Sequence, residues 1–382
     1  MRRMTTQKIT SLIKRVTVFC ILSVFFAGCR LISTGTMVYD YRKEEIINFT
    51  PSPVLPGRYR EVIIHSSPKN SCFFTMQTVR ENNHKYTLIR RKDFTGKELS
   101  SYKVMISVFP ESVRFAMSPD CDRIFITGCY LSGDNRRISC RCDLPDVPFE
   151  IEIYPKELPS LFNQDMVLGS SILHKHHEFL SKDVLLVILK REHRGTPSSR
   201  HEAYLATIDL TSSECHIIKQ LKKDDGTDFV TVSGEVEIKV NENGLAAILA
   251  DHHLFIYNHS EKKLSEGVFI GRSNLESDYL EDLCLSWISK DEICIWNRYD
   301  DMGRYVIYSI KTENYRTGKL NEKITNWFTP SVCTAGGKIV DFHSNTKTTF
   351  PKCRGSRIYE TFWLQEGVLG FTCDFYITNR LR

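Results

Sequence analysis

The chain has 382 residues, of which 41% are hydrophobic, 25% charged and 11% aromatic, and its formal net charge is +5. This composition excludes intrinsic disorder, a collagen-like repeat and a polytopic membrane protein, because it supplies enough apolar side chains for a core without being apolar throughout. The length suits one large domain or about two to three average ones. The basic excess would suit a nucleic-acid partner only if it is spread over the folded surface.

Residues 1–28 have the pattern of an export signal. Five basic and no acidic side chains precede an apolar run over 16–26, which ends in small residues. A membrane-spanning helix needs about 20 apolar residues, so a run of this length is predicted to be the core of a secretory signal peptide.

The end of this segment is more specific. Phe26-Ala27-Gly28-Cys29 resembles the lipobox of bacterial lipoproteins, although the residue three positions before the cysteine is usually Leu. The resemblance implies that Cys29 carries the lipid and becomes the new N-terminus. An ordinary signal peptide that ends at an incidental cysteine is the alternative. We therefore expect a membrane partner through an acyl anchor in a bacterial cell envelope, on the outer membrane or the periplasmic side.

Removal of the signal peptide changes the charge balance. The precursor has 51 Lys and Arg against 46 Asp and Glu, and the five excess basic residues all lie in 1–28. The chain from Cys29 onward therefore carries 46 groups of each sign. A balanced charge removes the electrostatic argument for nucleic acid, which needs a sustained basic surface, so no nucleic-acid partner is expected.

Thirteen cysteines are present, and eleven remain when Cys20 and Cys29 are set aside. Disulfides are permitted outside the cytoplasm, and an odd number leaves at least one thiol without an intramolecular partner. Several cysteines lie in apolar strand patterns, where buried free thiols are common, so disulfides and buried thiols both stay open. Cys140 and Cys142 have no second closely spaced pair, so the spacing does not indicate a metal site.

The rest of the sequence is a succession of short β-type runs. In chain order they lie at 61–65, 72–77, 113–117, 124–127, 184–189, 203–208, 236–240, 246–250, 254–257, 283–288, 293–296, 305–310, 339–342, 359–364 and 368–376. Helical periodicity is nearly absent. Many short strands with turn residues between them indicate an all-β sandwich or a barrel-like array.

Two kinds of turn decide between these architectures. Turns that join two strands begin at 67, 118, 181, 241 and 289, and turns that close a later hairpin lie at 93–97, 209–212, 258–261, 317–319 and 343–347. Asp, Asn, Ser and Gly suit these places because they form side-chain turns or tolerate positive φ. Two hairpins in each repeat give four strands, and four-stranded units repeated around an axis are the blades of a β-propeller.

The segment 115–124 resembles the repeat of the periplasmic protein TolB and its WD-like relatives. Their pattern is an apolar strand, a Ser-Pro-Asp-Gly turn, a basic residue and another apolar strand. Here the turn is Ser118-Pro119-Asp120-Cys121, with cysteine in place of glycine, and 285–293 repeats the pattern with Lys in place of Pro. The resemblance covers about 60–376 at the level of the repeat, and it implies a fold rather than a function.

The repeat length predicts seven blades, with six as the alternative. Blades are expected at 60–102, 111–154, 168–220, 233–267, 281–320 and 326–351, with a further hairpin at 357–376. An N-terminal strand over 37–41 would complete that hairpin and close the ring, which removes exposed sheet edges. The expected domains are the lipoprotein signal peptide over 1–28, a lipid-anchored tether with this possible closing strand over 29–58, and the propeller over 59–382.

One face of this propeller carries the candidate ligand-binding residues. They are Arg191, His193, Arg194 and His201 in the longest predicted loop, with Arg298 and Asp300 expected on the same face. Long loops on a rigid scaffold often carry function, and cationic side chains suit an anionic ligand. A plain insertion would explain the loop as well.

Histidines are concentrated at His174, His176 and His177, and imidazoles are common metal ligands. In the blade scheme, however, His193 and His201 lie at the opposite face, so the five imidazoles do not gather. We expect a partly exposed polar strand end at 174–177 and no metal site.

No nucleophile elbow, zinc-protease motif, phosphate-binding loop or dinucleotide fingerprint occurs in the sequence, so no catalytic residue and no cofactor is assigned. The sequence favours a lipid-anchored envelope propeller that acts as a binding or scaffolding module for a protein or an envelope polymer. The alternative is an envelope polysaccharide hydrolase or lyase with a loop-face site and a divalent metal, because some propellers of this kind use His and such a metal. Enzymatic activity is thus left open, with a non-enzymatic role preferred.

Overall fold

The computed structural model describes residues 31–53, 61–81, 84–104, 113–129, 137–143, 152–153, 166–168, 177–192, 201–212, 214–221, 236–250, 252–271, 275, 283–350 and 357–377. All elements assigned within these ranges are β-strands, numbered β1 to β30, which confirms the predicted all-β class. The predicted signal peptide and Cys29 lie outside the described residues, as do His193 and Arg194.

The strands form seven antiparallel sheets, which we number by their order in the chain. Sheet 1 consists of β3 (Val62–Ser67), β4 (Cys72–Glu81), β5 (His84–Asp93) and β6 (Glu98–Val104). Sheet 2 consists of β7 (Val113–Met117), β8 (Arg123–Cys129), β9 (Arg137–Asp143) and β10 (Glu152–Ile153).

Sheets 3 and 4 each have five strands. Sheet 3 consists of β11 (Met166–Leu168), β12 (His177–Phe179), β13 (Val184–Glu192), β14 (His201–Asp209) and β15 (Cys215–Leu221), and both β11 and β12 pair with β13. Sheet 4 consists of β16 (Val236–Val240), β17 (Leu245–Ala250), β18 (His253–Asn258), β19 (Lys263–Leu264) and β20 (Val268–Phe269), and both β19 and β20 pair with β18.

The last three sheets have four strands each. Sheet 5 consists of β21 (Leu283–Trp287), β22 (Glu292–Asn297), β23 (Arg304–Ser309) and β24 (Asn314–Lys319). Sheet 6 consists of β25 (Ile324–Thr329), β26 (Val332–Ala335), β27 (Lys338–Asp341) and β28 (Thr346–Thr349). Sheet 7 combines the two ends of the chain, β29 (Arg357–Gln365) and β30 (Val368–Ile377) with β1 (Leu31–Asp40) and β2 (Glu45–Pro53), in the order β2-β1-β30-β29.

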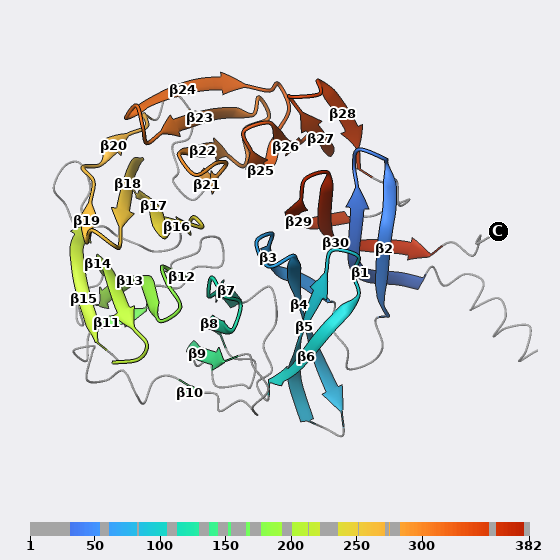
Figure 1. Cartoon of the computed structure of the whole chain (residues 1–382), viewed down its shortest axis with the longest axis horizontal. Helices are drawn as coiled ribbons and strands as arrows, with labels where there is room; N and C mark the ends of the chain where they lie inside the picture. Colours follow the sequence, from blue (N-terminus) through green and yellow to red (C-terminus); the bar gives the residue numbers. More distant parts are fainter. Residues whose placement is uncertain are drawn as a thin grey trace, which may run out of the picture.

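The sheets are arranged radially around a common centre, with one strand of each on the inside and the others in sequence outward (Figure 1). Four-stranded antiparallel units around an axis are the architecture of a β-propeller. The predicted fold class is therefore confirmed at this level.

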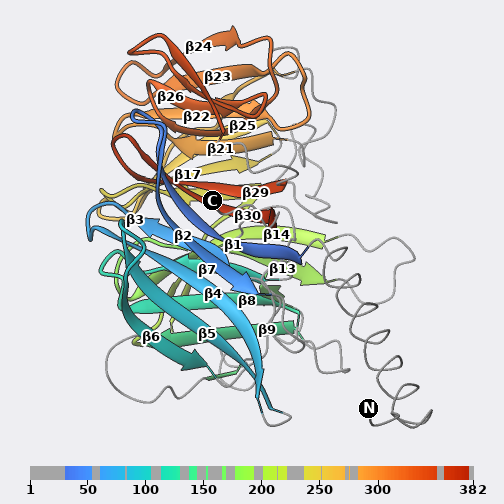
Figure 2. The same cartoon turned by 90° about the vertical axis from the view of Figure 1, so that its right-hand side faces the viewer.

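Sheet 7 shows what the N-terminal segment does. β1 pairs with β30 over its whole length, from Leu31 opposite Ile377 to Asp40 opposite Val368. In Figures 1 and 2 these N-terminal strands, in blue, lie beside the red C-terminal ones. Residues 31–53 are thus two strands, where the sequence pattern placed a tether with a single short strand over 37–41. The physical reason is that β30 would otherwise expose a row of unpaired backbone N–H and C=O groups.

The alternation of strand directions gives the ring two different faces. The turns from the first to the second strand of each sheet, such as 68–71 and 118–122, lie on one face together with the outer hairpin turns. The described connections from the second to the third strand, such as 298–303, lie on the other. We call these the turn face and the loop face.

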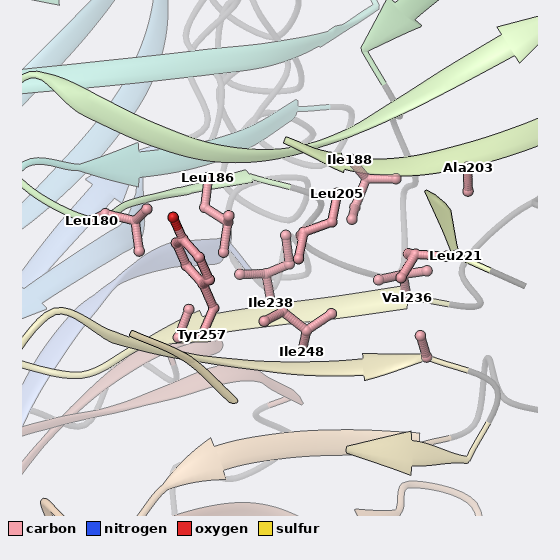
Figure 3. Packing of buried hydrophobic residues seen from close by; sticks show 12 residues of the cluster. Leu180, Leu186, Ile188, Ala203, Leu205, Leu221, Val236, Ile238, Ile248 and Tyr257 are labelled. Carbon is pink, nitrogen blue, oxygen red and sulfur yellow. The ribbon is translucent and has the colours of Figure 1, made fainter. Parts of the chain in front are cut away.

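Apolar side chains fill the spaces between neighbouring sheets. Between sheets 3 and 4, Leu186 and Ile188 of β13 face Ile238 of β16 and Ile248 of β17, all fully buried (Figure 3). Because a central strand is covered on both sides, β17 and the first six residues of β13, 184–189, are continuous apolar runs without polar alternation. This explains why the sequence showed short apolar runs instead of amphipathic strands.

The predicted turn at Ser118 lies on the turn face and is held by the serine side chain. The Ser118 hydroxyl accepts the backbone N–H groups of Asp122 and Arg123 at 3.2 and 3.0 Å. Cys121, which stands in place of the usual glycine, has a φ of +59°. A side chain at such a φ is disfavoured, which is why glycine is common at this position of the turn.

Sheets 1 and 7 meet around a buried charged cluster. The Glu61 carboxylate lies 2.9 Å from Lys92 Nζ and 3.4 Å from Arg90 Nη1, and it accepts the Thr75 hydroxyl. Only 3–4% of the Lys92 and Glu61 side chains is exposed. Lys92 pairs with Phe73, so both share the face of sheet 1 that packs on sheet 7. A charge buried here is tolerated only while its partner is present.

We predict that Glu61→Gln, which keeps the shape and removes the charge, lowers the free energy of unfolding by about 3–5 kcal/mol, because Lys92 is left buried without a carboxylate. The matched control is Glu322→Gln. Glu322 pairs with Lys338 and Lys347 near the surface, each at 3.2 Å, so its loss should change stability by about 1 kcal/mol or less. Urea unfolding of both variants checks this, and equal effects would contradict it.

Candidate binding site on the loop face

The predicted loop-face residues come from two connections. Arg191 pairs with Glu202 and His201 with Glu192, so residues 193–200 join the ends of β13 and β14. Arg298 lies in the equivalent connection, 298–303, between β22 and β23. Residues 193–200, with His193 and Arg194, lie outside the described residues, and sheet 4 separates sheets 3 and 5.

Asp300 organises its own loop. One carboxylate oxygen accepts the backbone N–H of Met302 at 3.0 Å and the Arg304 guanidinium at 3.0 Å, and the other accepts the backbone N–H of Arg304 at 2.8 Å. The Asp300 carbonyl also accepts the N–H of Gly303. Both carboxylate oxygens are thus in use within the loop, and Asp300 shapes the surface around Arg298.

Two further contacts hold the same loop. The Asn297 side chain accepts the backbone N–H of Tyr299 at 2.8 Å and donates to the carbonyl of Leu275 at 3.3 Å. Gly303 has a φ of +59°, and a Cβ there would lie 2.1 Å from the carbonyl oxygen of Glu322. The loop therefore needs glycine at this position to pack closely on the segment that leads to sheet 6.

The loop presents large side chains to solvent. Tyr299 is 57% exposed and Met302 38% exposed, although most large apolar side chains of the described residues are buried. Lys323 Nζ lies 5.0 Å from the centre of the Tyr299 ring, a cation–π distance. Arg298, the residue before Tyr299, is partly buried. A fixed loop with an exposed aromatic ring beside a guanidinium is a surface suited to contact a partner.

Below this loop, two charged side chains of one inner strand, β16, contact the neighbouring inner strand, β21. Glu237 of β16 accepts the backbone N–H of Leu285 on β21 at 3.1 Å, and its other oxygen lies 3.5 Å from Lys239 Nζ. The Trp287 ring N–H donates to the Lys239 carbonyl at 2.9 Å. These contacts join sheets 4 and 5. Glu237 itself is only 8% exposed.

Cys284 lies next to this group. Burial and, to a smaller extent, the Glu237 carboxylate raise the pKa of the Cys284 thiol to about 12, and a hydrogen bond with Arg298 only partly opposes them. The thiol is therefore protonated at neutral pH and is a poor nucleophile. Arg298 Nε has no hydrogen-bond partner among the described residues. The inner cluster of Glu237, Lys239, Cys284 and Arg298 is thus suited to bind a polar or anionic group rather than to transfer protons.

His177 differs from the expected exposed strand end. It is 1% exposed, and its ring meets the Phe125 ring edge-on at 5.2 Å, so it packs between sheets 2 and 3.

His174 and His176 lie outside the described residues. Within the described ranges, no group of three His, Cys, Asp or Glu side chains is placed to hold a metal ion. No helix among these residues is long and apolar enough to cross a membrane.

The inner cluster was missed because its members are far apart in the sequence and belong to ordinary strands. Glu237 and Lys239 are two residues apart in a short, otherwise apolar strand, so they point to the same face of sheet 4. That spacing is the one signal from which the site could have been suspected. Nothing in the sequence links it to Cys284, 45 positions beyond Lys239.

No protein-family model and no curated protein matches the chain. Several solved structures are similar to it. The β-propeller domain of the trilobed protease from Pyrococcus furiosus has 10% identity and a TM-score of 0.46, over 80% of this chain and 86% of that one. An oligogalacturonate lyase in complex with manganese has 9% identity and a TM-score of 0.44, over 80% and 87%.

A candidate TolB from Agrobacterium tumefaciens has 10% identity and a TM-score of 0.39, over 76% of this chain and 90% of that one. At these values the similarities carry no argument about activity. The assignment of this chain to the propeller architecture rests on its own sheet topology.

Proposed function

We propose that the protein is a closed, seven-bladed propeller that acts as a binding or scaffolding module in a bacterial cell envelope. The closed ring is supported by contacts between inner strands of successive sheets, which run in a cycle from β3 through β7, β12, β16, β21, β25 and β29 back to β3. Seven described sheets favour seven blades over six. Sheet 7 would be the closing blade, because it holds both ends of the chain.

The observation that carries the binding role is the 298–303 loop. It exposes Tyr299 and Met302 beside Arg298, and aromatic and Arg side chains dominate the binding energy of many protein interfaces. Asp300 and Asn297 fix the backbone of the loop, so little conformational freedom would be lost when a partner binds. Arg298 also belongs to the inner cluster below, where Lys239 supplies a second cation for an acidic group of that partner.

Binding is favoured over catalysis by the chemistry of the same residues. The Cys284 thiol is held protonated, and the Glu237 carboxylate is engaged by a backbone N–H and by Lys239. A general acid or base works best when its pKa lies near the working pH, and a nucleophile needs an activating base. Neither arrangement occurs among the described loop-face residues.

The proposed anchor would place this face close to the membrane. β1 begins at Leu31, so a lipid on Cys29 would be separated from the ring by a single residue, a span of about 8 Å at 3.8 Å per residue. Leu31 pairs with Ile377 at the loop-face end of sheet 7. An acyl anchor there would raise the local concentration of the loop face at the membrane surface, so weak contacts with an envelope partner would suffice.

A photo-crosslinker at position 299 tests the binding surface. In the full chain expressed in cells, we expect a discrete adduct with a protein or an envelope polymer, and Arg298→Ala should reduce its yield about tenfold by removing a central cation. The matched controls lie on β24: a crosslinker at Tyr315, which is 39% exposed, should give no such adduct, and Arg316→Ala should leave the adduct at position 299 unchanged.

Absence of an adduct at position 299, or an adduct that is insensitive to Arg298→Ala, would contradict a loop-face binding module. Cleavage of envelope polysaccharide by the purified chain, lost in Arg298→Ala, would replace the binding role by the enzymatic one. Metal analysis of the same preparation distinguishes a metal-dependent activity.

The anchor makes a separate prediction. Cys29→Ser should abolish incorporation of labelled palmitate and leave the precursor with its signal peptide uncleaved, because the lipid is attached to the cysteine sulfur. Cys20→Ser, within the apolar run, is the matched control and should be labelled and processed like the parent. Unchanged palmitate labelling of the Cys29→Ser variant would show that Cys29 is not the anchor.

A further inference from the structure

Two cysteines that are far apart in the sequence meet on the turn face. Cys72 begins β4 in sheet 1 and is fully buried, and Cys121 lies in the turn between β7 and β8 of sheet 2 and is 5% exposed. The two thiols lie within hydrogen-bond reach of each other. They therefore face each other across the junction of two neighbouring sheets.

The Asn70 side chain fixes this meeting point. Its amide group donates to Cys121 Sγ at 3.3 Å and to the Pro119 carbonyl at 3.2 Å, both in sheet 2. The same group donates to the Ser67 hydroxyl at 2.9 Å, in its own turn. One side chain thus joins the 67–71 turn to the 118–122 turn and holds the sulfur of Cys121 against sheet 1.

The surroundings make the two sulfurs unequal. The hydrogen bond from Cys121 lowers the pKa of Cys72 to about 6, against the effect of burial and with a further contribution from the Arg91 guanidinium. The same hydrogen bond, together with burial, raises the pKa of Cys121 to about 12, although His65 and Ser67 oppose this. Each of these opposite shifts depends on the contact between the two thiols, so the packed turns hold the two sulfurs together.

A second cysteine pair shows that burial between sheets does not by itself produce this arrangement. Cys294 of β22 and Cys333 of β26 are both fully buried in one apolar cluster between sheets 5 and 6. Burial raises the pKa of both thiols, to about 12 for Cys333. Both are therefore neutral thiols that fill space in the core, and they serve as an internal comparison.

We propose that Cys72 and Cys121 form a disulfide that joins sheets 1 and 2. The oxidant is an external disulfide, either a small-molecule one such as oxidised glutathione or that of a thiol oxidoreductase. While the turns are open, Cys72 loses its proton to solvent, and its thiolate attacks one sulfur of the external disulfide and releases one thiol. Cys121 then gives up its proton and attacks the Cys72 sulfur, which releases the second thiol. The protein pair loses two electrons and two protons, and the external disulfide becomes two thiols.

The position of the pair indicates when this reaction takes place. Neither sulfur is accessible once the turns have packed, so the exchange belongs to a stage of folding at which the two turns are still open. The disulfide is then covered and protected from reductants. It would close a loop of about 50 residues, which restricts the unfolded chain and stabilises the folded one. This inference concerns the turn face and does not depend on the loop-face site.

The test uses the full chain, reduced, unfolded in urea and refolded in a mixture of reduced and oxidised glutathione. The refolded chain is then unfolded again in urea without reductant, its free thiols are blocked with maleimide, and peptides are mapped without reduction. The expected result is one crosslinked species that contains Cys72 and Cys121, and labelling of Cys294 and Cys333. Maleimide labelling of both Cys72 and Cys121, or a crosslink from Cys72 to another cysteine, would overturn the proposal.

Cys121→Gly is the informative variant because glycine suits a φ of +59° better than cysteine does, so the turn is retained. In this variant Cys72 should become fully labelled by maleimide, and the chain should unfold at a lower urea concentration than the oxidised parent. Cys333→Ala is the matched control and should keep the Cys72–Cys121 crosslink. Retention of a Cys72 crosslink in Cys121→Gly would contradict the assignment of the partner.

Discussion

The pairing of β1 with β30 is the constraint on which the rest of the structure depends. Six sheets are built from consecutive strands, and the seventh has only the hairpin of β29 and β30 from its own part of the sequence. Ten residue pairs, from Leu31 with Ile377 to Asp40 with Val368, join the two ends of the chain. They also place β1 and β30 beside β3, at the junction of sheets 1 and 7 where Glu61 and Lys92 are buried. Without this pairing, that ion pair and the apolar side chains around Phe371 would face water.

The same constraint gives the two faces of the ring different roles. In sheet 7, β30 is the second strand from the inside and β1 is the third. The end of β30 and the start of β1 therefore lie on the loop face, where other sheets connect these two strands. The loop with Arg298 and Tyr299 lies on the same face. An anchor just before β1 would therefore act on the surface that we assign to binding. On the turn face, Asn70 and the Cys72–Cys121 pair connect sheets 1 and 2, next to sheet 7. The sites we assign to binding and to covalent stabilisation are thus on opposite faces.

Much of the fold could be predicted because four-stranded repeats have strong local signals. The expected blade limits agree closely with the sheets, and Ser118 makes the predicted turn. Other features depend on distant contacts. The segment 317–319 has turn-like residues but lies in β24, because Gly318 leaves space for the Tyr305 ring. The turn that precedes β24 ends at Glu313, which has a φ of +51°.

The candidate site was less predictable than the fold. Asp300 was predicted as a ligand contact, and only the structure shows that its oxygens hold its own loop. Glu237 and Cys284 meet through the packing of two sheets, which no local pattern records.

Hydrogen exchange, followed by mass spectrometry on the full chain, tests the proposed closure by β1 most directly. If β1 completes the ring, peptides over 31–40 should be protected as strongly as peptides over 368–377, and both should lose protection together as urea is raised, because each supplies the hydrogen-bond partners of the other. Rapid exchange of 31–40 while 368–377 stays protected would show that the N-terminal segment is a tether after all and would contradict the account.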